Sequence, residues 1–248
     1  MLYKLLAITI SLIISGKALA ALPSYSYSEI YMYDSQDCSN DSEQDFSDKI
    51  ISDPLEPINR HIFNINSTLD YLIFSPVTEI YLMSVPKRGR MHIANFLSNL
   101  GEPINFISLM LQGKFQGART SLGRFMTNST LGFFGIMDVA TDCNLKYHGE
   151  DSGQTLAHYG VPNGPYIVLP LFGPSSLRDT SGRVADYFAN PFKYIIEKRE
   201  RNIINATSAL HKRASANEII KTINNSLDPY ETAKMLYIQN RNKQINSK

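Results

Sequence analysis

The chain has few cysteines, few charges for its length and, after its first residues, no apolar run long enough to cross a bilayer. Two cysteines among 248 residues exclude a disulfide scaffold and any all-cysteine metal cage. Charged residues make up 19%, and 24 basic against 23 acidic residues leave a net charge of +1, so no overall field favours nucleic acid. Hydrophobic residues at 43% and aromatic residues at 10% indicate a globular chain with a sizeable core.

Catalytic and metal-binding motifs are also missing. The string Gly173–Leu177 holds Ser175 and Ser176 but lacks the second glycine and the strand–helix context of a hydrolase nucleophile elbow. None of the five histidines pairs with another at the i, i+4 spacing of a zinc helix, and no glycine-rich phosphate loop precedes a helix. Residues 151–158 and 178–179 contain acid and base groups, but such residues beside turns are more often caps or surface ion pairs. The sequence therefore predicts a non-enzymatic protein without cofactor or metal, and a lipid hydrolase is the disfavoured alternative.

The first residues have the features of an export signal. A basic start is followed by the apolar run Leu5–Ile14 and by the small-x-small triplet Ala18-Leu19-Ala20. We therefore expect a signal peptide over residues 1–20, cleaved between Ala20 and Ala21, with a buried N-terminal helix as the alternative. Residues 21–50 are rich in acids and predict a flexible acidic arm. A helical domain over residues 51–240 and a basic tail over residues 241–248 follow.

The two cysteines, Cys38 and Cys143, lie 105 positions apart, the first of them in the acidic arm. In an oxidising compartment they could form a disulfide, which would stabilise the fold by roughly 4–5 kcal/mol because it closes so long a loop. Two unpaired thiols are the alternative, and the sequence leaves the choice open.

Apolar residues recur at close to the helical period of 3.6 from residue 53 to about residue 127. Asp53-Pro54-Leu55-Glu56 predicts a capping box at the start of the first helix. Pro76 ends or kinks that helix, and another begins at about Lys87. Gly101 is a natural stop and Pro103 a natural restart, which divides this region into two helices. The apolar face of the first helix carries Ile58, Ile62, Ile65, Leu69 and Leu72.

The middle of the chain has a different pattern. Residues 131–137 form an apolar run broken by glycines, and residues 160–174 hold four prolines and three glycines around an apolar stretch. The second segment predicts irregular or extended backbone. Helical spacing returns near Phe192, and Asp228-Pro229-Tyr230-Glu231 predicts the N-terminus of a last helix. The fold class is therefore mainly α, with an irregular Gly/Pro-rich midsection.

Asparagine recurs inside the predicted helices, although it is a poor residue for a helix interior. Buried asparagines need hydrogen-bond partners, whereas a water-lined cavity satisfies them readily. The pattern indicates either solvated helix faces and caps or a protein in a membrane interface, apolar outside and polar within. The positions are Asn59, Asn64, Asn66, Asn95, Asn99 and Asn105.

Several long segments resemble the MlaA/VacJ family of outer-membrane proteins of the lipid-asymmetry pathway. They are DPLEPINRHIFNINSTLD (53–70), NFLSNLGEPINF (95–106), LQGKFQGA (111–118), RFMTNSTLGFFGIMDVA (124–140), GQTLAHYGVPNGPYIVLPLFGPSSLRD (153–179) and DPYETAKMLYIQNR (228–241). The resemblance implies a ring of amphipathic helices that lies in the membrane interface around a polar channel. Phospholipids misplaced in the outer leaflet would pass through this channel to a periplasmic lipid carrier, and the protein would associate with a trimeric porin.

The resemblance also implies roles for two segments. Residues 128–142 correspond to the family's channel-lining hairpin, in which Gly132 and Gly135 would supply flexibility while Phe133 and Phe134 act as a gate or simply as core. The hairpin candidates are Asn128, Leu131, Gly132, Phe133, Phe134, Gly135, Met137 and Asp138. A second segment is expected to influence the channel state, with candidates Asn59, Asn64, Ile65 and Asn66.

The family is usually lipidated on a cysteine directly after the leader, and this chain has Ala21 at that position. We therefore expect an unlipidated chain that is held at the periplasmic side of the outer membrane by its helix faces. A periplasmic adaptor that docks a porin or a carrier, without a channel role, is the alternative function.

Overall fold

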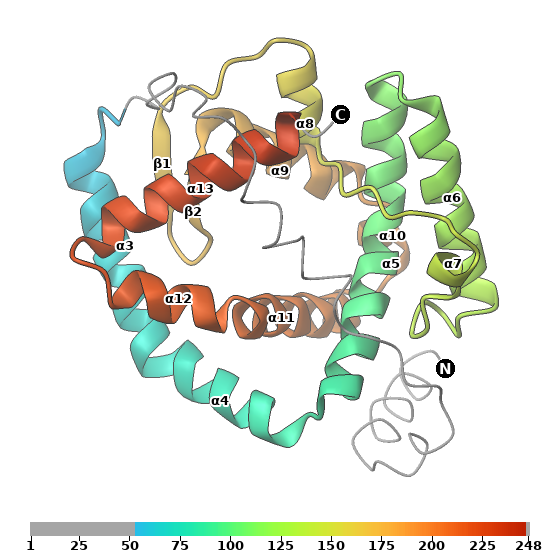
Figure 1. Cartoon of the computed structure of the whole chain (residues 1–248), viewed down its shortest axis with the longest axis horizontal. Helices are drawn as coiled ribbons and strands as arrows, with labels where there is room; N and C mark the ends of the chain where they lie inside the picture. The colour runs from blue at the N-terminus through green and yellow to red at the C-terminus, as the bar shows by residue number, and fades with distance from the viewer. Residues whose placement is uncertain (1–52, 247–248) are drawn as a thin grey trace, which may run out of the picture. The chain divides into compact units, whose positions relative to one another are not determined.

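The computed structural model describes residues 53–246, which form mainly helices and one two-stranded sheet (Figure 1). The predicted signal peptide, the acidic arm and Cys38 lie outside the described residues, so the cleavage and the disulfide stay predictions. The elements are α3 (Glu56–Leu69), the π-helical segment η2 (Asp70–Phe74), α4 (Ser75–Ser84), α5 (Lys87–Leu111), α6 (Phe115–Thr130), α7 (Val139–Asp142), α8 (Ser152–His158), β1 (Tyr166–Leu169), β2 (Gly173–Ser176), α9 (Leu177–Ala189), α10 (Phe192–Ile195), α11 (Lys198–Ser215), α12 (Asn217–Asn224) and α13 (Pro229–Asn246).

The helices of the described part follow one another around its edge rather than stacking in layers. Figure 1 shows α3, α4, α5 and α6 in sequence around the edge, with α12 and α11 end to end beside them and α13 across the two strands. Contacts join α5 to α6, α8 to α9, α11 to both α4 and α5, and α13 to α8, α12 and β2. The prediction of a mainly helical fold with an irregular midsection is confirmed.

The Gly/Pro-rich midsection forms an antiparallel hairpin. β1 pairs with β2 from Tyr166 opposite Ser176 to Leu169 opposite Gly173. Leu171 and Gly173 have φ angles of 66° and 73°, and the left-handed backbone at these positions turns the chain back on itself. The irregular or extended backbone predicted over residues 160–174 is therefore confirmed.

The starts of the first and last helices differ from each other, although the sequence predicts the same capping for both. The Asp228 Oδ1 atom accepts hydrogen bonds from the backbone N–H groups of Tyr230 and Glu231, as predicted for an N-cap. The prediction of a capping box at Asp53 is wrong, because the N-cap residue of α3 is Leu55 and no side chain caps the helix there. The Asp53 carboxylate instead accepts hydrogen bonds from Asn59 and Tyr230, because α13 lies within its reach.

Two predicted boundaries also fall inside helices. α5 runs without a break through Gly101 and Pro103, because Glu102 between them is held from α6 by Ser121 and Arg124. α13 continues to Asn246, past the boundary predicted at residue 240, and Arg241 is one of its buried residues.

Candidate functional site

Helix α3 holds strand β1 through two asparagines spaced seven residues apart. Asn59 donates to the Tyr166 carbonyl at 3.0 Å and accepts from the Val168 N–H at 2.9 Å, so its amide acts like a neighbouring strand. Asn66 does the same further on, with the Leu169 carbonyl and the Leu171 N–H, both at 2.9 Å. Seven helical residues rise about 10.5 Å and three strand residues about 10 Å, so the two spacings match.

This pairing changes the interpretation of the segment that was predicted to influence the channel state. Asn59 is 1% exposed and Asn66 is half-buried, and both bond to protein backbone. Asn64 and Ile65 are exposed on the other side of α3. The segment therefore couples the helix to the hairpin, and the side chains of Asn59 and Asn66 are satisfied by protein rather than by a water-filled cavity.

The predicted channel-lining hairpin is an irregular loop between α6 and α7 that projects apolar side chains outward. Leu131, Phe133 and Phe134 are 66%, 69% and 70% exposed, so none of them is part of the core. Phe133 and Phe134 have φ angles of 51° and 60°, in the left-handed region that side chains other than glycine seldom adopt. Such backbone persists only where the surroundings enforce it.

Polar side chains of α5 hold the backbone of this loop in its left-handed conformation. His92 and Asn95 both contact the Ile136 carbonyl, at 3.0 and 3.2 Å. Asn99 lies directly against Gly135, where an added Cβ would be 2.5 Å from the asparagine Cβ. A Cβ at Gly132 would be 2.2 Å from the Met137 carbonyl oxygen. The two glycines are thus needed for close approach, which corrects the expectation that they supply flexibility.

A buried ionic cluster centred on Arg124 supports the loop between α6 and α7. The Arg124 Nε atom lies 2.9 Å from the Glu102 carboxylate, and its Nη2 atom lies 2.9 Å from Asp138. Arg124 is 3% exposed and Glu102 is 1% exposed. Asn128 bridges the cluster to the loop, donating to Asp138 and accepting from the Ala140 N–H. Asn128 and Asp138 therefore support the loop, whereas Phe133 and Phe134 form its exposed surface.

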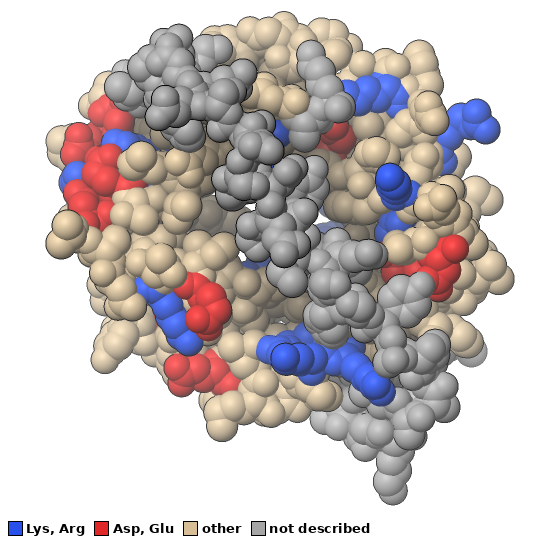
Figure 2. Space-filling model, viewed as in Figure 1, with Lys and Arg blue, Asp and Glu red and all other residues tan. Residues whose placement is uncertain are grey.

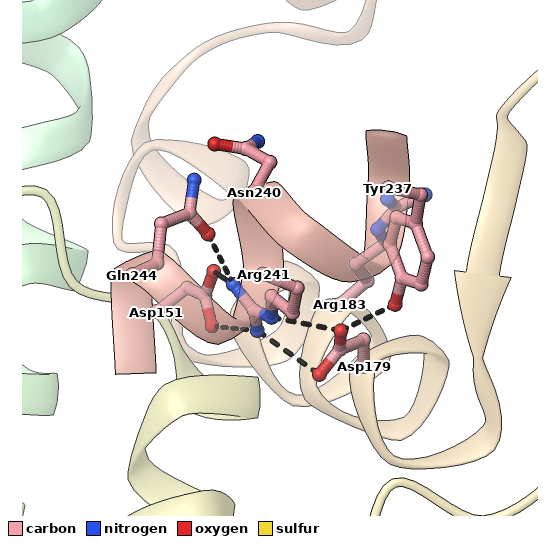
Figure 3. Close-up of a pocket in the computed structure, with 7 residues that line it drawn as sticks. All are labelled: Asp151, Asp179, Arg183, Tyr237, Asn240, Arg241 and Gln244. Carbon is pink, nitrogen blue, oxygen red and sulfur yellow. Dashed lines mark hydrogen bonds and ion pairs between the residues drawn. The ribbon is translucent and has the colours of Figure 1, made fainter. Parts of the chain in front are cut away.

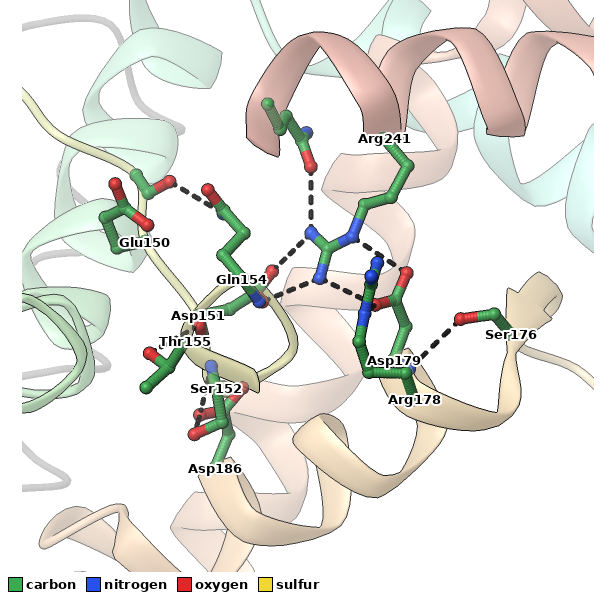
Figure 4. A network of polar contacts seen from close by, with 12 residues as sticks. Glu150, Asp151, Ser152, Gln154, Thr155, Ser176, Arg178, Asp179, Asp186 and Arg241 are labelled. Carbon is green, nitrogen blue, oxygen red and sulfur yellow. Dashed lines mark hydrogen bonds and ion pairs between the residues drawn. The ribbon is translucent and has the colours of Figure 1, made fainter. Parts of the chain in front are cut away.

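A second ionic cluster joins α13 to α8 and α9. Arg241 lies 2.8 Å from Asp151 and 2.8 Å from Asp179, and Tyr237 also donates to Asp179 (Figure 3). Figure 4 shows that Asp151, at the N-terminal end of α8, and Asp179 of α9 approach Arg241 from different segments. A pocket of 260 Å³ opens beside them. Burial alone would raise the pKa of Asp179, but hydrogen bonds from Tyr237 and Arg241 outweigh it and lower the pKa.

Of the acid and base residues considered from sequence, Asp151, Arg178 and Asp179 are therefore engaged in structural ion pairs. Asp151 caps α8, accepting from the Gln154 N–H at 2.8 Å, and Arg178 pairs with Asp179 at 3.1 Å. Ser175 and Ser176 are both 0% exposed, and their hydroxyls contact Thr180 and the Asp179 N–H. Among residues 53–246 no group of histidine, cysteine, aspartate or glutamate side chains has the arrangement of a metal site.

Polarity is inverted relative to an ordinary soluble domain. In the described part, nineteen buried residues are polar or charged, against eight that are hydrophobic. The outside carries large apolar side chains, and Figure 2 shows long stretches of one face without charged residues. Exposed apolar area on this scale marks contact with a membrane or another protein. The densest run follows η2 and α4, at Tyr71, Leu72, Ile73, Phe74, Val77, Ile80 and Met83. No helix of residues 53–246 is both long and apolar enough to cross a bilayer.

The family is decided by comparison with known proteins. The model of the MlaA lipoprotein family matches residues 51–244, which hold both ionic clusters and the loop between α6 and α7. The chain belongs to the MlaA lipoprotein family. The resemblance carried by the sequence segments is therefore confirmed over nearly the whole described part.

Relatives of this MlaA family member carry informative names. The chain is 40% identical over 141 residues to the Escherichia coli protein named intermembrane phospholipid transport system lipoprotein MlaA, covering 55% of this chain and 56% of that one. The Haemophilus influenzae protein of the same name is 29% identical over 79% of this chain and 80% of its own length. An uncharacterised Rickettsia bellii protein is 34% identical, over 77% of this chain and 76% of its own.

A solved structure also matches this MlaA fold. It is described as "Structural basis for maintenance of bacterial outer membrane lipid asymmetry", and the match has a TM-score of 0.70 at 33% identity. The match covers 79% of this chain and 100% of the solved one. The helical arrangement of residues 53–246 is therefore shared with that protein.

Proposed function

We propose that this chain transports phospholipids and so maintains the lipid asymmetry of a bacterial outer membrane. In this proposal it removes phospholipids misplaced in the outer leaflet and passes them to a periplasmic carrier. The single observation that carries the proposal is the inverted polarity of the fold: ionic clusters inside, and large apolar side chains outside. The family match and the names of the relatives support it.

The apolar exterior explains how the chain is held in the membrane. Each polar group exposed to hydrocarbon costs several kcal/mol, whereas burying apolar side chains there is favourable. The run over η2 and α4 offers such a surface, since Tyr71 is 78% and Met83 is 85% exposed. The helices would therefore lie within one leaflet and need not span the bilayer.

A phospholipid that leaves the outer leaflet needs a polar passage for its head. Figure 2 shows openings between the described residues near the centre of one face. We propose that this region is the passage, with the helices forming a ring around it. The loop from Leu131 to Met137 would contact the acyl chains, because Leu131, Phe133 and Phe134 are exposed and their backbone is held in place by the surrounding residues.

The remaining expectations complete the proposal. The chain is exported by residues 1–20, carries no lipid at Ala21, and acts at the periplasmic side of the outer membrane. It associates with a trimeric porin and hands phospholipid to a periplasmic lipid-binding carrier. The reaction is not catalytic, which agrees with the buried, hydrogen-bonded state of Ser175 and Ser176.

Deletion of the gene tests the proposal. Outer-leaflet phospholipid should rise, as measured by surface labelling of intact cells, and a plasmid copy should restore it. Mass spectrometry of the mature chain should find an unmodified N-terminus at Ala21. If outer-leaflet phospholipid does not change while the chain still co-purifies with a porin or carrier, the adaptor function is correct instead.

The loop has its own test. Phe133→Asp should reduce complementation strongly and leave the amount of protein unchanged, because Phe133 is 69% exposed and contributes little to the core. Leu227→Asp is the matched control: Leu227 is fully exposed in the turn between α12 and α13, so this variant should complement normally. Equal loss of protein in the Phe133 variant would show that the side chain serves only packing.

A further inference from the structure

Three aromatic rings at the corner between α9 and α10 surround the ammonium group of Lys193. Its Nζ atom lies 4.0 Å from the ring centre of Tyr187, 3.9 Å from that of Phe188 and 5.5 Å from that of Tyr194. Ring faces carry negative electrostatic potential, and several rings around one point attract a cation. The arrangement is that of an aromatic cage with a lysine of the same chain inside it.

The cage is held in shape by bonds that do not involve the lysine ammonium. Tyr194 donates its hydroxyl to the Phe188 carbonyl at 3.0 Å, which fixes α10 against the end of α9. Arg201 donates to the Lys193 carbonyl at 2.6 Å, and Phe192 packs on Phe125 of α6 with ring centres 6.3 Å apart. The rings would therefore remain in place if the lysine side chain moved away.

Lys193 has no carboxylate partner in the described part of the chain, although two acids lie close in sequence. Asp186 accepts instead from the Ser152 hydroxyl and N–H on α8. Glu197, four residues after Lys193, stands beyond the end of α10 as the N-cap of α11. The ammonium thus rests on ring faces alone, and the rings of Tyr187, Phe188 and Tyr194 are 54%, 58% and 70% exposed, so a ligand can reach them.

We propose that this cage binds the ammonium end of a zwitterionic phospholipid head group, of the phosphoethanolamine type, in exchange for Lys193. The head group's ammonium takes the place of the lysine ammonium between the rings, and Lys193 turns outward to pair with the head group's phosphate. The exchange leaves no charge without a partner: the head group's ammonium replaces the Lys193 ammonium between the rings, and the Lys193 ammonium pairs with the phosphate. The identity of the ligand as a lipid rests on the proposed function, whereas the binding of an alkylammonium does not.

The position of the Lys193 side chain can be observed directly. Its ε-methylene lies near ring faces and should show a ring-current shift in carbon–proton spectra of the purified, detergent-solubilised chain carrying 13C-labelled lysine. Titration with glycerophosphoethanolamine should move this signal saturably towards its unshifted value. Glycerophosphoglycerol, which has the phosphate but no ammonium, should leave it in place. Lys221, which pairs with Glu218 on α12, is the internal control and should not respond.

Two variants test the cage without its own lysine. In Lys193→Ala the rings are free, so tetramethylammonium should bind at least about tenfold more tightly than to the native chain. Adding Phe188→Leu to that variant should abolish the gain. The proposal is overturned if both head groups shift the Lys193 signal equally, if neither does, or if tetramethylammonium does not bind better to Lys193→Ala. A cage that binds while gene deletion leaves outer-leaflet phospholipid unchanged overturns the proposed function and not the cage.

Discussion

Replacing Arg124 by methionine tests how much the buried ionic cluster beneath the loop between α6 and α7 stabilises this fold. The substitution keeps much of the side-chain length and removes only the charge and the donors. The guanidinium now contacts Glu102, Asp138, the Thr141 hydroxyl and the Leu145 carbonyl. Without it, Glu102 would be a carboxylate at 1% exposure with no cation beside it.

The expected loss in the free energy of unfolding follows from the burial of Glu102. Removing one partner of a buried ion pair costs about 3–5 kcal/mol, because the other charge stays behind without water. A small domain has only about 5–15 kcal/mol of stability in total, so the loss should be large and easily measured. Lysine at position 124 should lose less, since it keeps the charge but cannot make the several directed bonds of a guanidinium.

Urea unfolding of the detergent-solubilised chain, followed by circular dichroism, measures the change. Hydrogen exchange should also accelerate at the loop amides, including the N–H of Gly135, which bonds to the Asn128 carbonyl. Arg60→Met is the matched control, because Arg60 pairs with acids that are 38–45% exposed and its loss should matter far less. A loss below about 1 kcal/mol for Arg124→Met, with unchanged exchange at the loop, would show that the buried ion pairs of Arg124 do not hold the loop in place.

Substitutions at Asn59, at two glycines and at Arg241 also have defined outcomes. Asn59→Leu should cost about 3 kcal/mol in urea unfolding, because it leaves buried groups of β1 without partners. Gly135→Ala should destabilise the fold, since φ is +88° and the new Cβ would meet Asn99, whereas Gly101→Ala should stabilise it by about 0.5–1 kcal/mol because nothing lies within 4 Å. The lowered pKa of Asp179 means that its stabilisation is complete above the unfolded value of 3.8 and is lost as the pH falls through the lower native pKa. Melting temperatures should therefore drop below about pH 4, and less steeply in Arg241→Gln.

Each of these has a control within the chain. Asn64→Leu changes an exposed asparagine on the same helix and should leave the unfolding free energy nearly unchanged. If it costs as much as Asn59→Leu, the bonds to β1 are not the cause. Equal effects of alanine at the two glycines would contradict the close approach at Gly135. Identical acid profiles for the native chain and Arg241→Gln would show that Asp179 does not contribute.

Local patterns in the sequence were sufficient to predict the helical class, the irregular or extended midsection and one cap. Periodicity near 3.6 residues depends on neighbours three and four positions apart, so it can be recognised without knowing the tertiary fold. The same holds for Asp228, whose partners Tyr230 and Glu231 lie two and three residues away. Asp53 has the same local pattern and a different outcome, because Asn59 and Tyr230 compete for its carboxylate.

The partners of the helical asparagines and of the buried ion pairs are known only from the tertiary structure. Sequence showed that asparagines recur in the helices, and left solvated faces and a polar interior as alternatives. In the fold Asn59 bonds to residues 107 and 109 positions away, and Arg241 to residues 90 and 62 positions away. The two asparagines lie seven residues apart on α3, and the backbone groups they bond lie three residues apart along β1. This match in spacing predicts the contact only when α3 and β1 are already known to be neighbours.

The family, the helical class and the irregular or extended midsection could be predicted from the sequence, because these depend on short-range periodicity and on long matching segments. The tertiary structure alone decided which polar groups are buried, that α5 passes unbroken through Gly101 and Pro103, and that Phe133 and Phe134 point outward. The reason is physical: a buried carboxylate, amide or guanidinium is stable only beside a specific partner, and here those partners come from distant parts of the chain.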